Sequence, residues 1–332
     1  MCPLDSSPYL GYVSPGVYLM ERLTGTVFRA QSGFFTVQTP AGAIVCRLRG
    51  RLRKERLDTD IVAVGDRVVV EPAGDGTGLI VEVLPRTRVL SRRAPPAHPD
   101  DRRQVEQVIV ANPDQAVFVF ACAQPAPHLR MLDRLLVAAE AASLPALICA
   151  NKVDLVTLEE AQALFGLYAT IGYEVLYTSA KTGVGVDALR QRLTGKLSVL
   201  SGPSGVGKTS LLNAMQPGLG LQVREVSQIT TKGRHTTVVP ELVLIAGGGY
   251  VADTPGLRAM ALWDIEPGEL EAYFPDIRPF VAECEFSDCT HTHEPGCAVR
   301  AAVARGQIHP ARYESLLRLR AEIEEELEKA LR

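Results

Sequence analysis

The clearest indication of the fold comes from Leu197-Ser198-Val199-Leu200-Ser201-Gly202-Pro203-Ser204-Gly205-Val206-Gly207-Lys208-Thr209. It places the pattern G-x-x-x-x-G-K-[ST] directly after an apolar strand, and residues 210–215 continue as a helix. Glycines let successive backbone N–H groups turn toward phosphate oxygens, and the start of a helix adds partial positive charge. The sequence therefore predicts a phosphate-binding loop between a strand and a helix.

Two side chains of this loop are expected to act on the phosphates. We expect Lys208 to reach the β- and γ-phosphates as a catalytic cation and Thr209 to ligate Mg²⁺. The expected nucleotide contacts from this part of the chain are Gly202, Pro203, Ser204, Gly205, Val206, Gly207, Lys208, Thr209 and Ser210.

A second motif, Asn151-Lys152-Val153-Asp154, follows the apolar strand 144–150. Guanine presents two adjacent N–H donors, and a carboxylate accepts both in a charge-assisted pair. Adenine lacks that pair of donors, so Asp154 disfavours an adenine-specific ATPase or kinase. We expect Asn151, Lys152 and Asp154 to contact the nucleotide, together with Ser179, Ala180 and Lys181, which follow the strand 174–178.

A third motif, Asp253-Thr254-Pro255-Gly256, follows the strand 250–252. We expect Asp253 to hold Mg²⁺ through water and the amide of Gly256 to sense the γ-phosphate.

Between residues 105 and 260, apolar strand-like runs alternate with helical stretches. The runs are 115–122, 144–150, 174–178, 197–200 and 250–252, and the helical stretches are 131–142, 158–171, 186–193 and 209–215. This alternation predicts an open α/β sheet with mainly parallel strands. A further amphipathic helix is expected over 311–332.

Residues 21–86 have a different sequence pattern, in which β-rich runs are separated by glycine and proline. The predicted strands are 26–28, 34–37, 43–46, 67–70 and 79–83, which suits a five-stranded oligonucleotide-binding barrel. Residues 47–56 hold six basic residues and one acidic residue, and residues 21–110 carry 15 basic and 11 acidic residues in a chain of net charge −3. This basic segment is consistent either with contacts to an RNA backbone or with a solvated loop. Few aromatic residues accompany it, so base stacking is expected to contribute little.

Three of the seven cysteines lie close together near the C-terminus. Cys284, Cys289, His291 and Cys297 span fourteen residues and offer the Cys₃His set of a structural zinc site, with His293 as the rival for the imidazole position. Cys2, Cys46, Cys122 and Cys149 lie outside this cluster and are interpreted as buried thiols rather than ligands.

These motifs resemble the set found in GTPases, but their order is changed. The motifs at 151 and 179 precede the phosphate loop at 202 and the motif at 253, which indicates a circular permutation. Permutation is physically tolerable because each motif follows the carboxyl end of a strand, so one crevice is assembled from either chain order. The segments TTKGRHTT and CEFSDCTHTHEPGCAV extend this set of motifs. Together they make residues 21–320 resemble the RsgA (YjeQ) family, the ribosome small-subunit-dependent GTPases of bacteria.

The resemblance implies an enzyme that hydrolyses GTP to GDP and phosphate in late maturation of the 30S subunit. It implies GTP-dependent docking on 16S rRNA through the barrel and the zinc module, release after hydrolysis, and His291 as the fourth zinc ligand. The expected organisation is a flexible tail at 1–20, a barrel at 21–86, a permuted GTPase domain at 87–268 and a zinc-binding domain with a C-terminal helix at 269–332.

The catalytic machinery is expected to depend on a partner. Leu257 stands where Ras-like enzymes carry a water-orienting glutamine, so His235 is the candidate to position the attacking water. Thr236 is favoured over Thr237 as the Mg²⁺ ligand of the switch loop. Because the glutamine is missing, an RNA-binding assembly scaffold that uses the nucleotide only as a switch is the alternative function.

The composition argues against a largely disordered protein and against a membrane-spanning protein. The chain has 332 residues, of which 46% are hydrophobic and 22% charged, enough for a substantial core without long disorder. The longest apolar runs, such as 117–123, are far shorter than the roughly 20 residues of a membrane span. A cytoplasmic monomer with no membrane contact is expected.

Overall fold

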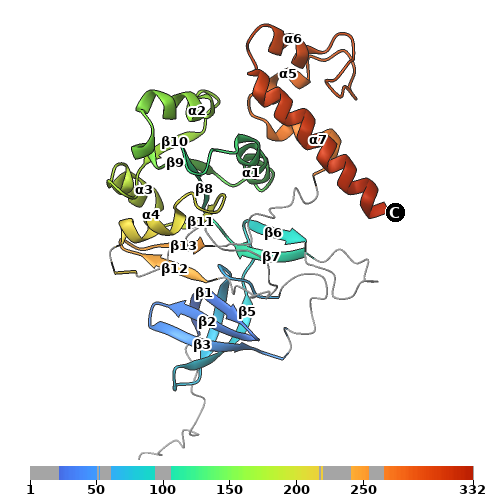
Figure 1. Cartoon of the computed structure of the whole chain (residues 1–332). Coiled ribbons are helices and arrows are strands. Elements are labelled where there is room, and N and C mark those ends of the chain that lie inside the picture. The colour runs from blue at the N-terminus through green and yellow to red at the C-terminus, as the bar shows by residue number, and fades with distance from the viewer. Residues whose placement is uncertain are drawn as a thin grey trace, which may run out of the picture.

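The computed structural model describes residues 22–50, 52, 61–93, 106–216, 218–219, 241–253 and 265–331. These ranges form a β-barrel, a six-stranded sheet with helices on both faces, and a C-terminal helical module (Figure 1). The predicted multidomain class is confirmed, whereas the predicted tail at 1–20 lies outside the described residues. Within the described ranges, every helix is too short or too polar to cross a lipid bilayer.

The barrel closes in the strand order β1-β2-β3-β5-β4. Its strands are β1 Leu23–Gln31, β2 Phe34–Thr39, β3 Gly42–Leu48, β4 Arg67–Pro72 and β5 Thr77–Val83. In β3, Ile44 and Cys46 are buried while Val45 and Arg47 face solvent, because successive side chains of a strand point to opposite sides. The predicted five-stranded barrel is confirmed.

The central sheet has the order β10-β9-β8-β11-β13-β12. Its strands are β8 Gln115–Ala121, β9 Ala146–Asn151, β10 Glu174–Thr178, β11 Leu197–Ser201, β12 Leu242–Ile245 and β13 Gly249–Asp253. The pairs from β10 to β13 are parallel, and only the pairing of the edge strand β12 with β13 is antiparallel. The mainly parallel sheet follows the prediction.

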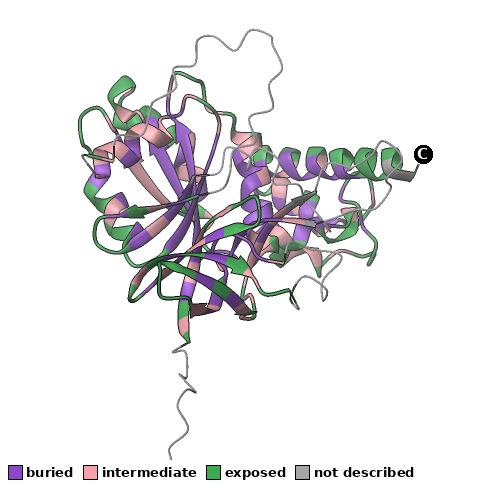
Figure 2. Cartoon of the chain, turned by 90° about the horizontal axis from the view of Figure 1, so that it is seen from below, coloured by how far each residue is buried: buried purple, intermediate pink, exposed green. Residues whose placement is uncertain are grey.

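Strand β8 shows why helices cover both faces of the sheet. Phe118 and Phe120 pack with helices α1 (Leu129–Ala141) and α2 (Leu158–Thr170), whereas Val117 and Val119 pack with α3 (Val186–Leu193) and α4 (Lys208–Met215). A strand buried on both faces reads as a continuous apolar run, as 115–122 does. Figure 2 shows buried residues along the strands of the central sheet.

A short two-stranded sheet, β6 (Val89–Arg93) and β7 (Glu106–Ala111), lies where the barrel meets the central sheet. Gly65 is at φ 90°, and a Cβ there would lie 2.1 Å from the carbonyl oxygen of Ala111. Only glycine allows this approach, which lets the Ala111 N–H donate to Val64 O at 2.8 Å. The barrel is therefore fixed to the rest of the molecule by backbone contacts.

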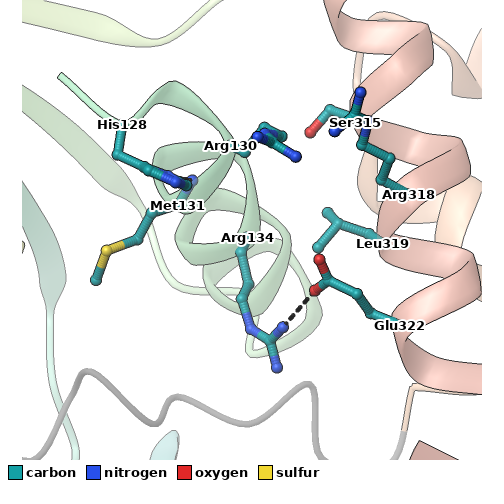
Figure 3. Close-up of a pocket in the computed structure, with 8 residues that line it drawn as sticks. All are labelled: His128, Arg130, Met131, Arg134, Ser315, Arg318, Leu319 and Glu322. Carbon is teal, nitrogen blue, oxygen red and sulfur yellow. Dashed lines mark hydrogen bonds and ion pairs between the residues drawn. The ribbon is translucent and has the colours of Figure 1, made fainter. Parts of the chain in front are cut away.

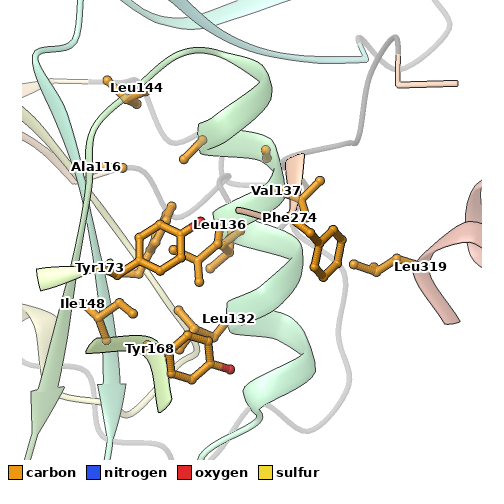
Figure 4. Close-up of a cluster of buried hydrophobic side chains, with 14 of the residues drawn as sticks. Ala116, Leu132, Leu136, Val137, Leu144, Ile148, Tyr168, Tyr173, Phe274 and Leu319 are labelled. Atoms are coloured by element: carbon orange, nitrogen blue, oxygen red, sulfur yellow. The ribbon is translucent and has the colours of Figure 1, made fainter. Parts of the chain in front are cut away.

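The C-terminal module packs on helix α1. It consists of the 3₁₀ helix η4 (Pro267–Tyr273) and of α5 (Arg278–Val281), α6 (Ala298–Ala304) and α7 (Pro310–Leu331). Phe274 and Leu319 lie on the side of α1 that faces away from the sheet (Figure 4). Across the groove between α1 and α7, Arg134 donates to Glu322 Oε2 at 2.8 Å (Figure 3). The hydrophobic core thus continues from the sheet into this module.

One buried arginine joins α7 to α1. Arg312 is 1% exposed, donates to both carboxylate oxygens of Asp276 at 2.9 and 3.2 Å, and also donates to Asp133 of α1. Its guanidinium lies 4.6 Å from the ring centroid of Phe274. The two acids therefore depend on one cation for their charge balance.

Replacing Arg312 with alanine is expected to lower the free energy of unfolding by about 3–5 kcal/mol, since it leaves two buried carboxylates without their partner. Denaturant unfolding followed by circular dichroism measures this. The control is Arg318→Ala, which removes an exposed i,i+4 pair with Glu314 and is expected to cost about 0.5 kcal/mol or less. Equal losses in both variants would contradict the prediction.

Candidate functional site

The predicted nucleotide-binding motifs meet at one edge of the sheet. In the strand register, Asn151 at the end of β9 lies opposite both Ala121 of β8 and Thr178 of β10, and Leu200 of β11 lies opposite Asp253 of β13. The motifs that follow these strands are therefore neighbours although the chain reaches them in permuted order. This edge, at the carboxyl ends of parallel strands, is where open α/β sheets bind ligands.

The phosphate-binding loop has the backbone that its glycines permit. Gly202 is at φ 145°, and a Cβ there would lie 2.0 Å from Val119 O, so no larger residue fits. Gly205 and Gly207 are at φ 76° and 96°, and α4 begins directly after Gly207. Lys208 Nζ donates to the carbonyl oxygens of Gly202 and Pro203, both at 2.8 Å. The ammonium group therefore lies over the loop whose amides are expected to hold the phosphates.

The first two residues of the 151–154 motif hold the phosphate loop in place. Asn151 is 1% exposed, and its Nδ2 donates to Val206 O at 2.8 Å. Lys152 Nζ donates to Gly205 O at 2.7 Å and also to Gln124 O. These contacts tie the loop after β9 to the loop after β11, which joins the predicted base site to the predicted phosphate site.

Asp154 is the carboxylate left to read the base. Its Oδ1 accepts a hydrogen bond from Ser179 Oγ at 2.6 Å, and Lys181 Nζ lies 4.0 Å from Oδ2. Ser179 is buried and accepts in turn from the N–H of Thr182 at 3.2 Å, which orients its hydroxyl toward Asp154. The Asp154 side chain is 14% exposed, so the oriented carboxylate stays accessible to a ligand.

The predicted metal ligands also come together. Ligand atoms of Cys284, Cys289, His291 and Cys297 all lie within 4.8 Å of one another. His291 Nδ1 is 3.6 Å from Cys284 Sγ and 3.4 Å from Cys297 Sγ. His293 is exposed, and its Nδ1 faces Thr292 Oγ1 at 2.8 Å. Three sulfurs and one imidazole nitrogen thus form a compact donor set able to hold a metal ion.

Comparisons with known proteins agree with this geometry. The model of the RsgA GTPase family matches residues 83–263, and that of the RsgA N-terminal domain matches residues 24–80. The chain belongs to the RsgA GTPase family. It is accordingly a GTP hydrolase, and the predicted RsgA resemblance is confirmed.

Several RsgA relatives match along nearly their whole length. The small ribosomal subunit biogenesis GTPase RsgA of Gemmatimonas aurantiaca is 48% identical over 303 residues, which cover 90% of this chain and 97% of the relative. The protein of the same name from Moorella thermoacetica is 44% identical over 301 residues, covering 91% and 97%.

Two solved structures share the RsgA architecture. The crystal structure of YjeQ from Thermotoga maritima superposes with a TM-score of 0.75 at 36% identity, covering 91% of this chain and 98% of that one. YloQ, described as a circularly permuted GTPase, superposes with a TM-score of 0.71 at 34% identity, covering 94% and 99%. The predicted permuted GTPase fold is confirmed.

Only some of the predicted switch residues of this RsgA-family GTPase lie within the described residues. Asp253 ends β13 next to the strand that leads into the phosphate loop. His235, Thr236, Gly256 and Leu257 lie outside the described residues, so the roles predicted for them stay predictions.

Sequence motifs missed two residues that support the nucleotide site. Thr178 Oγ1 donates to Asn151 Oδ1 at 3.2 Å, and Gln124 supplies a carbonyl oxygen to Lys152. Thr178 directly precedes the Ser179 motif, so its place at a strand end was the available signal. The sequence around Gln124 carried no such signal, because Gln124 contributes only its backbone carbonyl group.

Proposed function

We propose that this GTP hydrolase serves the biogenesis of the small ribosomal subunit, docks on that subunit in its GTP-bound state, and leaves it after hydrolysis. The observation that carries the proposal is the match to relatives named small ribosomal subunit biogenesis GTPases over 97% of their length. The barrel, the sheet and the metal module are all included in a match of that extent. The scaffold alternative is set aside because the family consists of GTP hydrolases.

Within the proposed site, the amides of the phosphate loop and Lys208 bind the β- and γ-phosphates and stabilise the charge that develops on them. Thr209, Asp253 and Thr236 are proposed to hold Mg²⁺, which when bound neutralises part of the phosphate charge. Because Leu257 cannot orient water, we assign that task to His235, with the bound subunit setting its position.

Asp154 is proposed to select guanine by accepting both base donors. Asp154→Asn is expected to weaken GTP binding at least about 100-fold, since one base donor then faces an NH₂ group and the other loses its charged acceptor. The variant is expected to bind xanthosine triphosphate better than the wild type, because the asparagine amide can donate to the carbonyl that replaces the guanine amine. Competition binding of the two nucleotides measures both effects.

The matched control for this change is Asp187→Asn on α3, whose side chain is 81% exposed. It is expected to leave the nucleotide preference unchanged. Retention of GTP affinity within threefold by Asp154→Asn would contradict the assignment.

The barrel offers a face suited to RNA. Arg47 in β3 and Arg49 directly after this strand are exposed. The Arg47 guanidinium lies 4.5 Å from the centroid of the ring of Phe34, a residue that is 44% exposed. The rest of the basic run, residues 51 and 53–56, lies outside the described residues. We propose that this face contacts the backbone of 16S rRNA, with few stacked bases.

The metal is proposed to be one structural zinc ion. Tetrahedral zinc, with bonds of about 2.3 Å to sulfur and about 2.0–2.1 Å to nitrogen, places a sulfur and a nitrogen about 3.5 Å apart. The separations of 3.4 and 3.6 Å around His291 fit that geometry. All four positions are filled by the protein, which indicates a structural rather than a catalytic ion.

Further parts of the proposal rest on the same relatives and on the sequence. We propose that the protein works in the cytoplasm as a monomer. The domain boundaries at residues 86 and 268 are proposed with it.

Phosphate release from GTP and from ATP, with and without purified small ribosomal subunits, tests the proposed function. Strong stimulation by the subunit with GTP alone is expected. In the same assay, His235→Ala is expected to keep GTP binding and to lose most of the stimulation. Turnover of GTP that the subunit leaves unchanged would overturn the proposed partner, and full stimulation of His235→Ala would overturn the assignment of His235.

A further inference from the structure

A buried carboxylate faces the imidazole of the metal centre. Glu271, in η4, is 7% exposed, and its Oε1 lies 3.4 Å from His291 Nε2. The other ring nitrogen, Nδ1, faces the cysteine sulfurs, so Nε2 points away from them and toward Glu271. Among the described residues, no group meets Nε2 with hydrogen-bond geometry, although His291 is 0% exposed. A buried imidazole N–H needs an acceptor, and the Glu271 carboxylate is the group that faces it.

The position of Glu271 is itself fixed by helix α7. Arg320 is 7% exposed and donates to Glu271 Oε2 at 2.6 Å. The same guanidinium donates to Pro267 O at 3.2 Å and to Thr290 O at 2.5 Å. One carboxylate oxygen is therefore held by Arg320, which leaves the other aimed at His291.

The backbone of His291 is held from the same helix. His291 is at φ 62°, a conformation that side-chain-bearing residues rarely adopt, and its carbonyl oxygen accepts a hydrogen bond from Tyr313 Oη at 2.5 Å. Backbone and ring are thus approached from separate directions, the backbone by Tyr313 and the ring by Glu271. Such an arrangement serves to set the orientation of a ligand ring.

We propose that Glu271 is a positioning residue for the metal centre. Its Oε1 accepts the Nε2–H of His291, which fixes the tautomer that leaves Nδ1 free to bind an ion and increases the basicity of that nitrogen. A small movement of the ring closes the present 3.4 Å to a hydrogen bond. The inference rests on the proposed zinc site, and it extends that site to an element outside the four ligands.

The test compares Glu271→Gln with Glu269→Gln, an exposed glutamate two residues away on the same 3₁₀ helix. Zinc affinity is measured by competition with a chelator, and cobalt(II) absorption reports the geometry of the centre. Glu271→Gln is expected to weaken zinc binding 10- to 100-fold and to alter the cobalt spectrum, because the neutral amide holds the imidazole less strongly. Glu269→Gln is expected to match the wild type in both measurements.

Arg320→Gln separates positioning from simple structural support. It removes the buried ion pair but leaves the Glu271 carboxylate opposite His291, so it is expected to lower stability and to weaken zinc binding less than Glu271→Gln does. If Arg320→Gln weakens zinc binding as much as Glu271→Gln does, or if Glu271→Gln matches the wild type, the positioning role is overturned.

Should Glu271→Gln fail to fold, Glu271→Asp replaces it, since aspartate keeps the charge beside Arg320 but withdraws the carboxylate from Nε2. Wild-type zinc affinity in that variant counts against the proposal. A wild-type protein that binds no zinc would instead overturn the proposed zinc site, so the two failures are distinguishable.

Discussion

Lys208→Ala is expected to lower kcat/KM for GTP at least about 100-fold. Lys208 directly follows the glycines of the phosphate loop, and its ammonium group lies 2.8 Å from the carbonyl oxygens of Gly202 and Pro203. In the transition state it would stabilise negative charge on the β- and γ-phosphates, and loss of one such preorganised donor costs roughly 10²–10³ in rate. GTP affinity is expected to fall as well, since the phosphates also carry charge in the ground state.

The control for this variant is Lys196→Ala. Lys196 directly precedes β11, at the opposite end of the strand that leads into the phosphate loop, and its Nζ donates to Gln115 Oε1 at 3.0 Å. Single-turnover hydrolysis and GTP binding are measured on both variants with the small subunit present. A loss of less than threefold in Lys208→Ala would refute the predicted role of this lysine.

Cys289→Ser is expected to abolish stable zinc binding and to unfold the module around the metal centre. Helices η4, α5 and α6 have only seven, four and seven residues, too few to be stable by their own hydrogen bonds. Structural zinc sites contribute about 10–16 kcal/mol of apparent binding free energy to folding, so losing one thiolate removes most of the support of this region. Zinc content per chain and hydrogen exchange over 265–309 measure the effect.

Two controls accompany the zinc experiment. His293→Ala removes the exposed rival imidazole and is expected to keep one zinc per chain. Cys149→Ser removes a cysteine of the central sheet, where burial raises the pKa of the thiol to about 12 and keeps it protonated at neutral pH. Zinc loss in His293→Ala together with retention in Cys289→Ser would refute the predicted ligand set.

Local sequence patterns were sufficient to predict the site motifs and the fold class. Residues 197–209 pass from an apolar strand through a glycine-rich turn to a helix, and that local order is enough to recognise a phosphate loop. Cysteine and histidine spacing likewise marked the metal cluster, because few other chemistries use three thiols and an imidazole within fourteen residues. The β-rich runs separated by glycine and proline were enough to predict the barrel. The alternation of apolar strands with helical stretches was enough to predict the mainly parallel sheet.

The groups that support those motifs could be identified only from the packing of distant segments. Asp133 and Arg312 are 179 residues apart in the chain, and neither looks different from a surface residue of its helix until the helices pack. Glu271 lies twenty residues before His291, with nothing in its neighbourhood to distinguish it from the exposed Glu269. A local sequence pattern reflects the conformation that its residues prefer. The charge balance of a buried group depends instead on which distant segments pack around it and exclude water.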